Sequence, residues 1–187
     1  DSSADTAHFV MNGDYSDNNN STVDTTDNYA HVDATNIETV DIHSTAMDTN
    51  SFVPGFGYKA DVVDNHLSLD DAGLTSAVVT GDQGLTLTLN STAVTTIDAS
   101  GMTVSGASTL GLSVSDSAVS THAITITGSD GADTIDMSNQ TKVMTINSGA
   151  GNDTINGGTA ADVINTGTGA DHVTGNACAD QVTFGTH

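Results

Sequence analysis

Basic residues are almost absent from this sequence. The 187-residue chain has two Lys or Arg residues, Lys59 and Lys142, against 24 Asp or Glu residues, and its formal net charge is −22. Contacts with nucleic-acid phosphates or anionic membranes need basic side chains, so neither is expected as a partner. The single cysteine, Cys178, excludes a disulfide framework within the chain. No apolar run reaches membrane-spanning length, so no transmembrane segment is predicted.

Helix-favouring residues are also scarce. Glu38 is the only glutamate, while Thr, Val, Ile, Gly, Asn, Asp and Ser dominate, a composition typical of strands and turns. We therefore predict an all-β protein with almost no helix. A hydrophobic content of 36% and regular patterning argue against disorder. The acidity then reflects either a halophile-type surface or bound cations, and oxygen ligands with little basic competition favour calcium.

The patterning divides the chain into three expected parts. Residues 1–60 form an irregular, β-rich N-terminal segment, with alternation at residues 37–42 that predicts a strand. Residues 61–127 contain short alternating strands at residues 85–89, 110–114 and 124–126, separated by polar turns. Such strands fit a sandwich, a barrel or a solenoid. Residues 128–187 form the third part. The chain begins without methionine, so we expect a piece of a longer protein or a processed one.

Four consecutive nonapeptides occupy residues 148–183 of the third part. Each has aspartate at its sixth position and a β-branched apolar residue at its eighth. An earlier copy at residues 128–136 places Asp133 and Ile135 at the same positions. The repeated aspartates are Asp153, Asp162, Asp171 and Asp180, and the repeated apolar residues are Ile155, Ile164, Val173 and Val182.

The nine-residue spacing predicts a turn followed by a minimal strand. Glycine, asparagine and aspartate turn sharply, while three residues around one apolar side chain make a short strand. One repeat buries too little alone, so neighbours must stack into a coil. Alternate turns then share an edge, where aspartates and carbonyls converge. Calcium takes six to eight such oxygens, so its binding should drive folding.

The pattern resembles the RTX nonapeptide G-G-x-G-x-D-x-U-x, where U is a large apolar residue, best at residues 149–155. The resemblance implies a parallel β-solenoid, or β-roll, with calcium-binding turns in the C-terminal third. The candidate calcium site residues are Gly128, Asp130, Gly131, Asp133, Gly149, Gly151, Asp153, Gly158, Asp162, Gly167, Gly169, Asp171 and Asp180.

The two edges of this coil should differ in affinity. Turns 148–153 and 166–171 keep glycine at the fourth position, whereas turns 157–162 and 175–180 have Ala160 and Cys178 there. One longer half-coil through residues 138–141 would bring the Asp133 turn to the first of these edges. We therefore predict a stronger calcium row flanked by Asp133, Asp153 and Asp171. A weaker site is predicted between Asp162 and Asp180. Lys142 either replaces a calcium charge in the half-coil without aspartate or is a solvated lysine.

Residues 34–40, 79–87 and 95–101 resemble segments of RTX-type bacterial surface-layer proteins. This resemblance implies a secreted, non-enzymatic structural module at the bacterial cell surface. It would be exported by type I secretion and would assemble with copies of itself, with cell-surface polysaccharide as a further partner. The alternatives are the calcium-binding secretion domain of an RTX exoenzyme, a protease or lipase, and an RTX adhesin. The histidines lack zinc-site spacing and no G-x-S-x-G elbow occurs, so no catalytic residue is predicted.

Overall fold

The computed structural model describes residues 5–12, 29–33, 37–45, 65–104 and 110–185. All regular secondary structure in these residues is β-strand, which confirms the predicted fold class. None of the described residues lies in a helix that could cross a membrane. The strands predicted at residues 37–42, 85–89, 110–114 and 124–126 are all present.

The described strands form two parallel sheets. Odd-numbered strands make an eight-stranded sheet and even-numbered strands a seven-stranded sheet, here called the odd and even sheets. The odd sheet contains β1 (Thr6–Asn12), β3 (Thr39–Thr45), β5 (Ser76–Gly81), β7 (Thr96–Met102), β9 (Ile124–Thr127), β11 (Met144–Asn147), β13 (Val163–Asn165) and β15 (Gln181–Thr183). The even sheet contains β2 (Tyr29–Asp33), β4 (Asn65–Asp70), β6 (Leu85–Leu89), β8 (Leu110–Asp116), β10 (Ala132–Asp136), β12 (Thr154–Asn156) and β14 (His172–Thr174).

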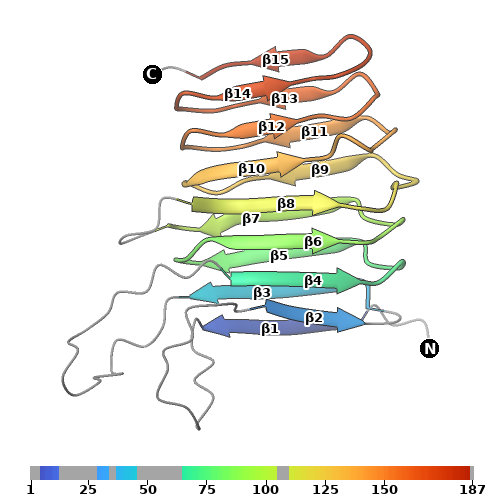
Figure 1. Ribbon diagram of the computed structural model, residues 1–187, viewed down its shortest axis with the longest axis vertical. Helices are drawn as coiled ribbons and strands as arrows, with labels where there is room; N and C mark the ends of the chain where they lie inside the picture. The colour runs from blue at the N-terminus through green and yellow to red at the C-terminus, as the bar shows by residue number, and fades with distance from the viewer. Residues whose placement is uncertain (1–4, 13–28, 34–36, 46–64, 105–109, 186–187) are drawn as a thin grey trace, which may run out of the picture.

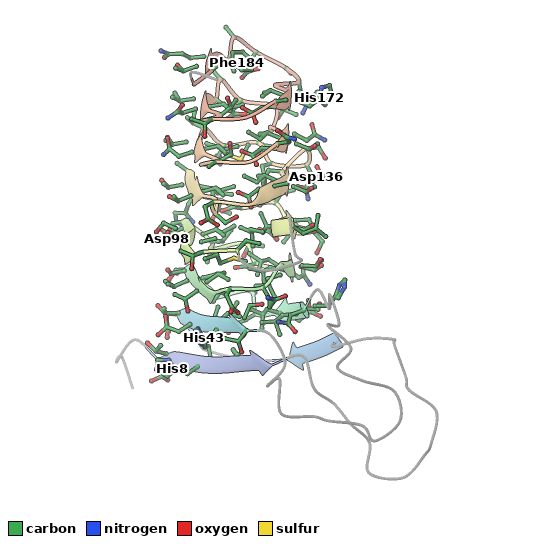
Figure 2. All side chains as sticks on the ribbon, turned by 90° about the vertical axis from the view of Figure 1, so that its left-hand side faces the viewer. His8, His43, Asp98, Asp136, His172 and Phe184 are labelled. Atoms are coloured by element: carbon green, nitrogen blue, oxygen red, sulfur yellow. The ribbon has the colours of Figure 1, made fainter. Side chains whose placement is uncertain are left out.

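Consecutive strands alternate between the sheets, so each pair of strands makes one coil and the coils stack into a parallel β-solenoid (Figure 1). Alternate side chains of each strand point inward, and the two sheets enclose an apolar core. Figure 2 shows outward residues on both sides, with Asp98 on the odd sheet and Asp136 on the even sheet. Strand register stacks the inward residues in columns, such as Ile126, Ile146, Ile164 and Val182, and Val114, Ile135, Ile155 and Val173.

The turns lie along two edges of the stack. The first edge, on the left in Figure 1, joins each odd strand to the next even strand and includes turns 128–131, 148–153 and 166–171. The second edge, on the right, joins each even strand to the next odd strand and includes turns 117–123, 137–143, 157–162 and 175–180. The structure confirms the edge assignment predicted from the nonapeptide spacing, including the place of the Asp133 turn on the first edge.

The strands shorten along the stack. They are four to seven residues long from β3 to β11 and three residues long from β12 to β15. Both sheets run across the expected boundary at residues 127 and 128. The three-part division of the chain therefore stays a prediction.

Candidate metal centre

Three aspartates follow one another along the first edge, one coil apart. Asp133 and Asp153 are each only 1% exposed. The Asp133 N–H donates to Asp153 Oδ1 at 2.9 Å, and the Asp153 N–H donates to Asp171 Oδ1 at 3.1 Å. Each of these carboxylates therefore satisfies a backbone donor of the preceding coil. The three side chains form one column.

Burial makes negative charge in this column costly. Burial is the main reason that the pKa of Asp133 is raised to about 6, in spite of its hydrogen bonds to Ser129. Burial also raises the pKa of Asp153, and the nearby charge of Asp171 acts in the same direction. No ion pair in the described residues involves these carboxylates. A bound cation would compensate their charge.

Asp153 carries the clearest sign of a ligand. Its Oδ2 atom is buried and has no hydrogen-bond partner, because the nearby Ser148 hydroxyl, which lowers the pKa of Asp153, donates to the Thr166 carbonyl oxygen at 2.7 Å. By contrast, Ser129 donates to both oxygens of Asp133, through its N–H at 2.8 Å and its hydroxyl at 2.6 Å. A buried polar atom without a partner is rare because it costs free energy. A hard cation beside Asp153 Oδ2 would remove that cost, so the donor fits calcium.

Glycines let the first-edge turns stack closely. Gly149, Gly151, Gly167 and Gly169 all have positive φ, between 70° and 141°. A Cβ atom on Gly167 would overlap the carbonyl oxygen of Gly149, and one on Gly169 would overlap that of Gly151. The carbonyls of one turn therefore face the next turn with no side chain between them. Rows of carbonyl oxygens beside carboxylates supply the ligand types that calcium prefers.

The earlier copy of the repeat contributes Gly128 and Gly131 to this edge. A Cβ atom on Gly128 would overlap Asp133 Oδ2, and one on Gly131 would meet the Val104 side chain and the Gly111 backbone in β8. Asp130 is exposed, and its Oδ1 accepts the Val104 N–H at 2.7 Å. The Asp130 carboxylate thus caps the turn before it.

Asp162 and Asp180 form the corresponding pair on the second edge. The Met144 N–H donates to Asp162 Oδ1 at 2.8 Å, and the Asp162 N–H donates to Asp180 Oδ1 at 2.9 Å. Asp162 differs from Asp153 because its Oδ2 also has a partner, the Gly158 N–H at 3.0 Å. Asp162 is therefore fully hydrogen-bonded without a metal.

The second-edge turns also depart from the glycine pattern. Cys178 and Asn176 have φ of 74° and 70°, and among the described residues they alone have positive φ without being glycine. Ala160 does not have positive φ, so turn 157–162 has a different shape. The Asn176 amide donates to the Gly157 carbonyl oxygen at 2.5 Å. A carbonyl that accepts an amide N–H is less available to a cation.

Side chains alone do not assemble a metal site here. Within the described ranges, no three His, Cys, Asp or Glu side chains come together as a group of metal ligands. A calcium site in these turns must therefore take most of its oxygens from the backbone. This requirement explains why the glycines matter as much as the aspartates.

Sequence reasoning missed three polar residues of the second edge. Asp116 aligns with Leu89 in the sheet, is 2% exposed and has an Oδ2 atom without a partner. Burial raises its pKa, and the alternation of β8 could have shown that it points inward. Asn139 and Gln140 contact carbonyls of the preceding turn, and no sequence pattern marks them.

Lys142 is exposed and makes no ion pair with any described residue.

Comparison with known proteins agrees with the repeat geometry. The family model for the RTX calcium-binding nonapeptide repeat, in four copies, matches residues 125–136, 145–173 and 156–186. Searches of curated proteins and of solved structures returned no match. The matched residues include both edges of the last coils and their aspartate columns. In these residues the chain consists of RTX calcium-binding nonapeptide repeats, and calcium is the ion that such repeats bind.

Proposed function

We propose that the chain is a calcium-dependent structural module of a secreted bacterial surface-layer protein, in which calcium drives folding and self-assembly. The buried, unpartnered Oδ2 of Asp153 carries the calcium part of the proposal. The ligands would be Asp133, Asp153 and Asp171 with backbone carbonyls on the first edge. Asp162 and Asp180 would form a weaker site on the second edge.

The RTX repeats support an extracellular location, which fits this proposal. RTX repeat proteins are typically secreted by type I systems. Extracellular calcium-binding modules work with weak sites, because the ion is abundant outside the cell. Coils that fold only when calcium binds would stay unfolded during export and fold afterwards.

Shape and charge support a lattice. The solenoid is a straight stack whose two flat outer faces run along its whole length (Figures 1 and 2). The formal net charge of −22 makes copies of the chain repel one another. Calcium ions shared between copies would remove this repulsion and so couple assembly to the same ion that folds the coils.

A calcium titration after chelation tests the proposal. Circular dichroism would follow the β signal while light scattering and electron microscopy follow assembly. We expect the β signal to rise first and two-dimensional sheets to form at higher calcium, with magnesium much less effective. Retention of the full β signal after exhaustive EDTA treatment, with no metal found by elemental analysis, would contradict the calcium role.

The same preparation separates the alternative functions. Calcium-dependent folding without sheets, together with glycan binding on an array, would indicate an adhesin. Calcium-dependent folding without sheets or glycan binding, with a catalytic domain elsewhere in the full-length protein, would indicate the secretion domain of an exoenzyme.

A further inference from the structure

The turn 137–143 breaks the nonapeptide pattern on the second edge. It joins β10 to β11 and has no aspartate at the place of Asp162 and Asp180 in the later turns. Asn139 and Gln140 lie in this turn. Gln140 is fully buried although its side chain is polar.

The two amides contact the carbonyl oxygens of the preceding turn. Asn139 Nδ2 lies 2.8 Å from the Asp116 carbonyl oxygen, 3.1 Å from that of Ser117 and 3.4 Å from that of Ala118. Gln140 Nε2 donates to the Ala118 carbonyl oxygen at 2.6 Å. Three consecutive carbonyls therefore converge on neutral N–H donors. Without these amides, the same converging carbonyl oxygens would attract a cation.

Gln140 completes the arrangement from its other end. Its Oε1 accepts the Ser120 N–H at 2.8 Å, while its Nε2 also lies 3.0 Å from Asn139 Oδ1. The side chain thus satisfies both a donor and an acceptor of the turn below. A cation could satisfy only the acceptors.

We propose that the Asn139 and Gln140 amides replace calcium in this turn, so that the coils from β4 to β11, apart from the Asp133 segment, form a calcium-independent base for the calcium-dependent coils. The base comprises the described residues 65–104, 110–127 and 137–147, and the tip comprises residues 148–185. Residues 128–136 lie between the two parts, because their Asp133 is a proposed calcium ligand of the first edge. This inference rests on the proposed role of calcium in folding the tip.

Other second-edge turns of the base are closed by side-chain hydrogen bonds in the same way. Ser91 donates its hydroxyl to the Leu74 carbonyl at 2.7 Å and accepts the Ala93 N–H at 3.2 Å. Ser120 donates to the Val94 carbonyl at 2.9 Å. These turns need no ion to satisfy their backbone groups.

The apolar core is also concentrated in the base. Beyond Ile146, only Ile155 and Ile164 belong to the buried apolar residues. Burying one apolar side chain contributes less free energy than ordering a nine-residue repeat costs in entropy. The base places two or three apolar residues of most strands in the core, such as Leu85, Leu87 and Leu89 of β6.

Asp116 is the feature of the base that argues against the proposal. Its buried Oδ2 has no partner, while its Oδ1 accepts the Ser91 N–H at 3.2 Å and the Ala118 N–H at 3.1 Å. A calcium ion bound at Asp116 would make the base calcium-dependent. The experiment must therefore distinguish the amide turn from this carboxylate.

Hydrogen–deuterium exchange of the whole chain, with calcium and after chelation, tests the base directly. At a calcium concentration 100 times the dissociation constant, binding should slow exchange in residues 148–185 about 100-fold. Exchange in residues 65–104, 110–127 and 137–147 should change less than about threefold. Equal loss of protection in both parts after chelation would overturn the proposal. No change in the tip would instead refute the calcium role in the proposed function.

Two variants then assign the effect. Gln140→Ala should make protection of the base fall about tenfold or more in EDTA, because it leaves a buried donor and a buried acceptor unpaired. Asn147→Ala, on the exposed outer face of β11, is the matched control and should change nothing. Asp116→Asn should leave the base calcium-independent. An unaffected base in Gln140→Ala, or loss of a bound calcium ion in Asp116→Asn, would overturn the assignment.

Discussion

On the first edge, turns 148–153 and 166–171 keep glycine at the second and fourth positions, and Asp153 leaves one buried oxygen without a partner. On the second edge, turns 157–162 and 175–180 have the same aspartate spacing, but Asp162 is fully hydrogen-bonded. Backbone hydrogen bonding alone does not distinguish the edges, because the Gly149 carbonyl of the first edge also accepts an N–H, from Thr168 at 3.0 Å. Aspartate at the sixth position builds the coil on both edges, whereas glycine at the second and fourth positions lets the first-edge turns stack with no side chain between them.

The largest expected effect comes from removing one carboxylate on each edge. Asp153→Asn should weaken calcium binding about tenfold to a hundredfold, because a charged ligand in the middle of the first-edge column is lost. Asp162→Asn should weaken binding less than about tenfold. Titration calorimetry would measure affinity and ion count for both variants. A larger loss for Asp162→Asn would show that the second edge holds the stronger site.

Exchanging the fourth-position residues should give effects of opposite sign. Gly169→Ala places a Cβ atom against the Gly151 carbonyl at φ of 141°, so we expect destabilisation of about 1–3 kcal/mol. Cys178→Gly relieves a left-handed φ of 74° and should stabilise by about 1 kcal/mol. Thermal unfolding of the calcium-loaded protein would measure both. If both variants shifted the midpoint in the same direction, the fourth position would not distinguish the edges.

The smallest expected effect is a pH dependence of the calcium-free protein. The pKa of Asp133 is raised from 3.8 to about 6, mainly by burial, so its folded state binds the proton more tightly than the unfolded chain does. The contribution to stability is then present at low pH and lost as the pH rises through about 6. Circular dichroism in EDTA should show more β signal at pH 5 than at pH 7. Asp133→Asn should flatten this profile, and an unchanged profile would implicate other groups.

The part of the fold that was predictable from sequence is the part with a strict period. Turn edges and aspartate columns of residues 148–183 followed from the nine-residue spacing, because each turn stacks on the turn 18 residues earlier. In residues 65–127 the spacing between stacked residues varies. Leu87, for example, pairs with Leu67 on one side and Val114 on the other. Without a constant period, the strands were visible but their pairing was not.

The site was predictable to the same extent. The sequence indicated the aspartates, and the weaker second edge stays a prediction. For the half-coil without aspartate the sequence left Lys142 as a substitute for calcium charge or as a solvated lysine, whereas the contacts there are made by Asn139 and Gln140. Neutral amides leave no charge pattern to detect. The alternation of β8 was enough to predict that Asp116 points inward, but its place beside Leu89 depends on the register of β8 against β6, which only the paired strands define.

The hydrogen bonds between successive first-edge aspartates all run in the same direction along the stack. Each N–H of Asp133 or Asp153 is satisfied by the carboxylate of the following coil, and never by the preceding one. The last coil of such a column therefore has an aspartate N–H with no following carboxylate to accept it. At the first coil of the column, the aspartate N–H is satisfied by the next coil. The two ends of such a column therefore offer unlike templates for any strand added to them.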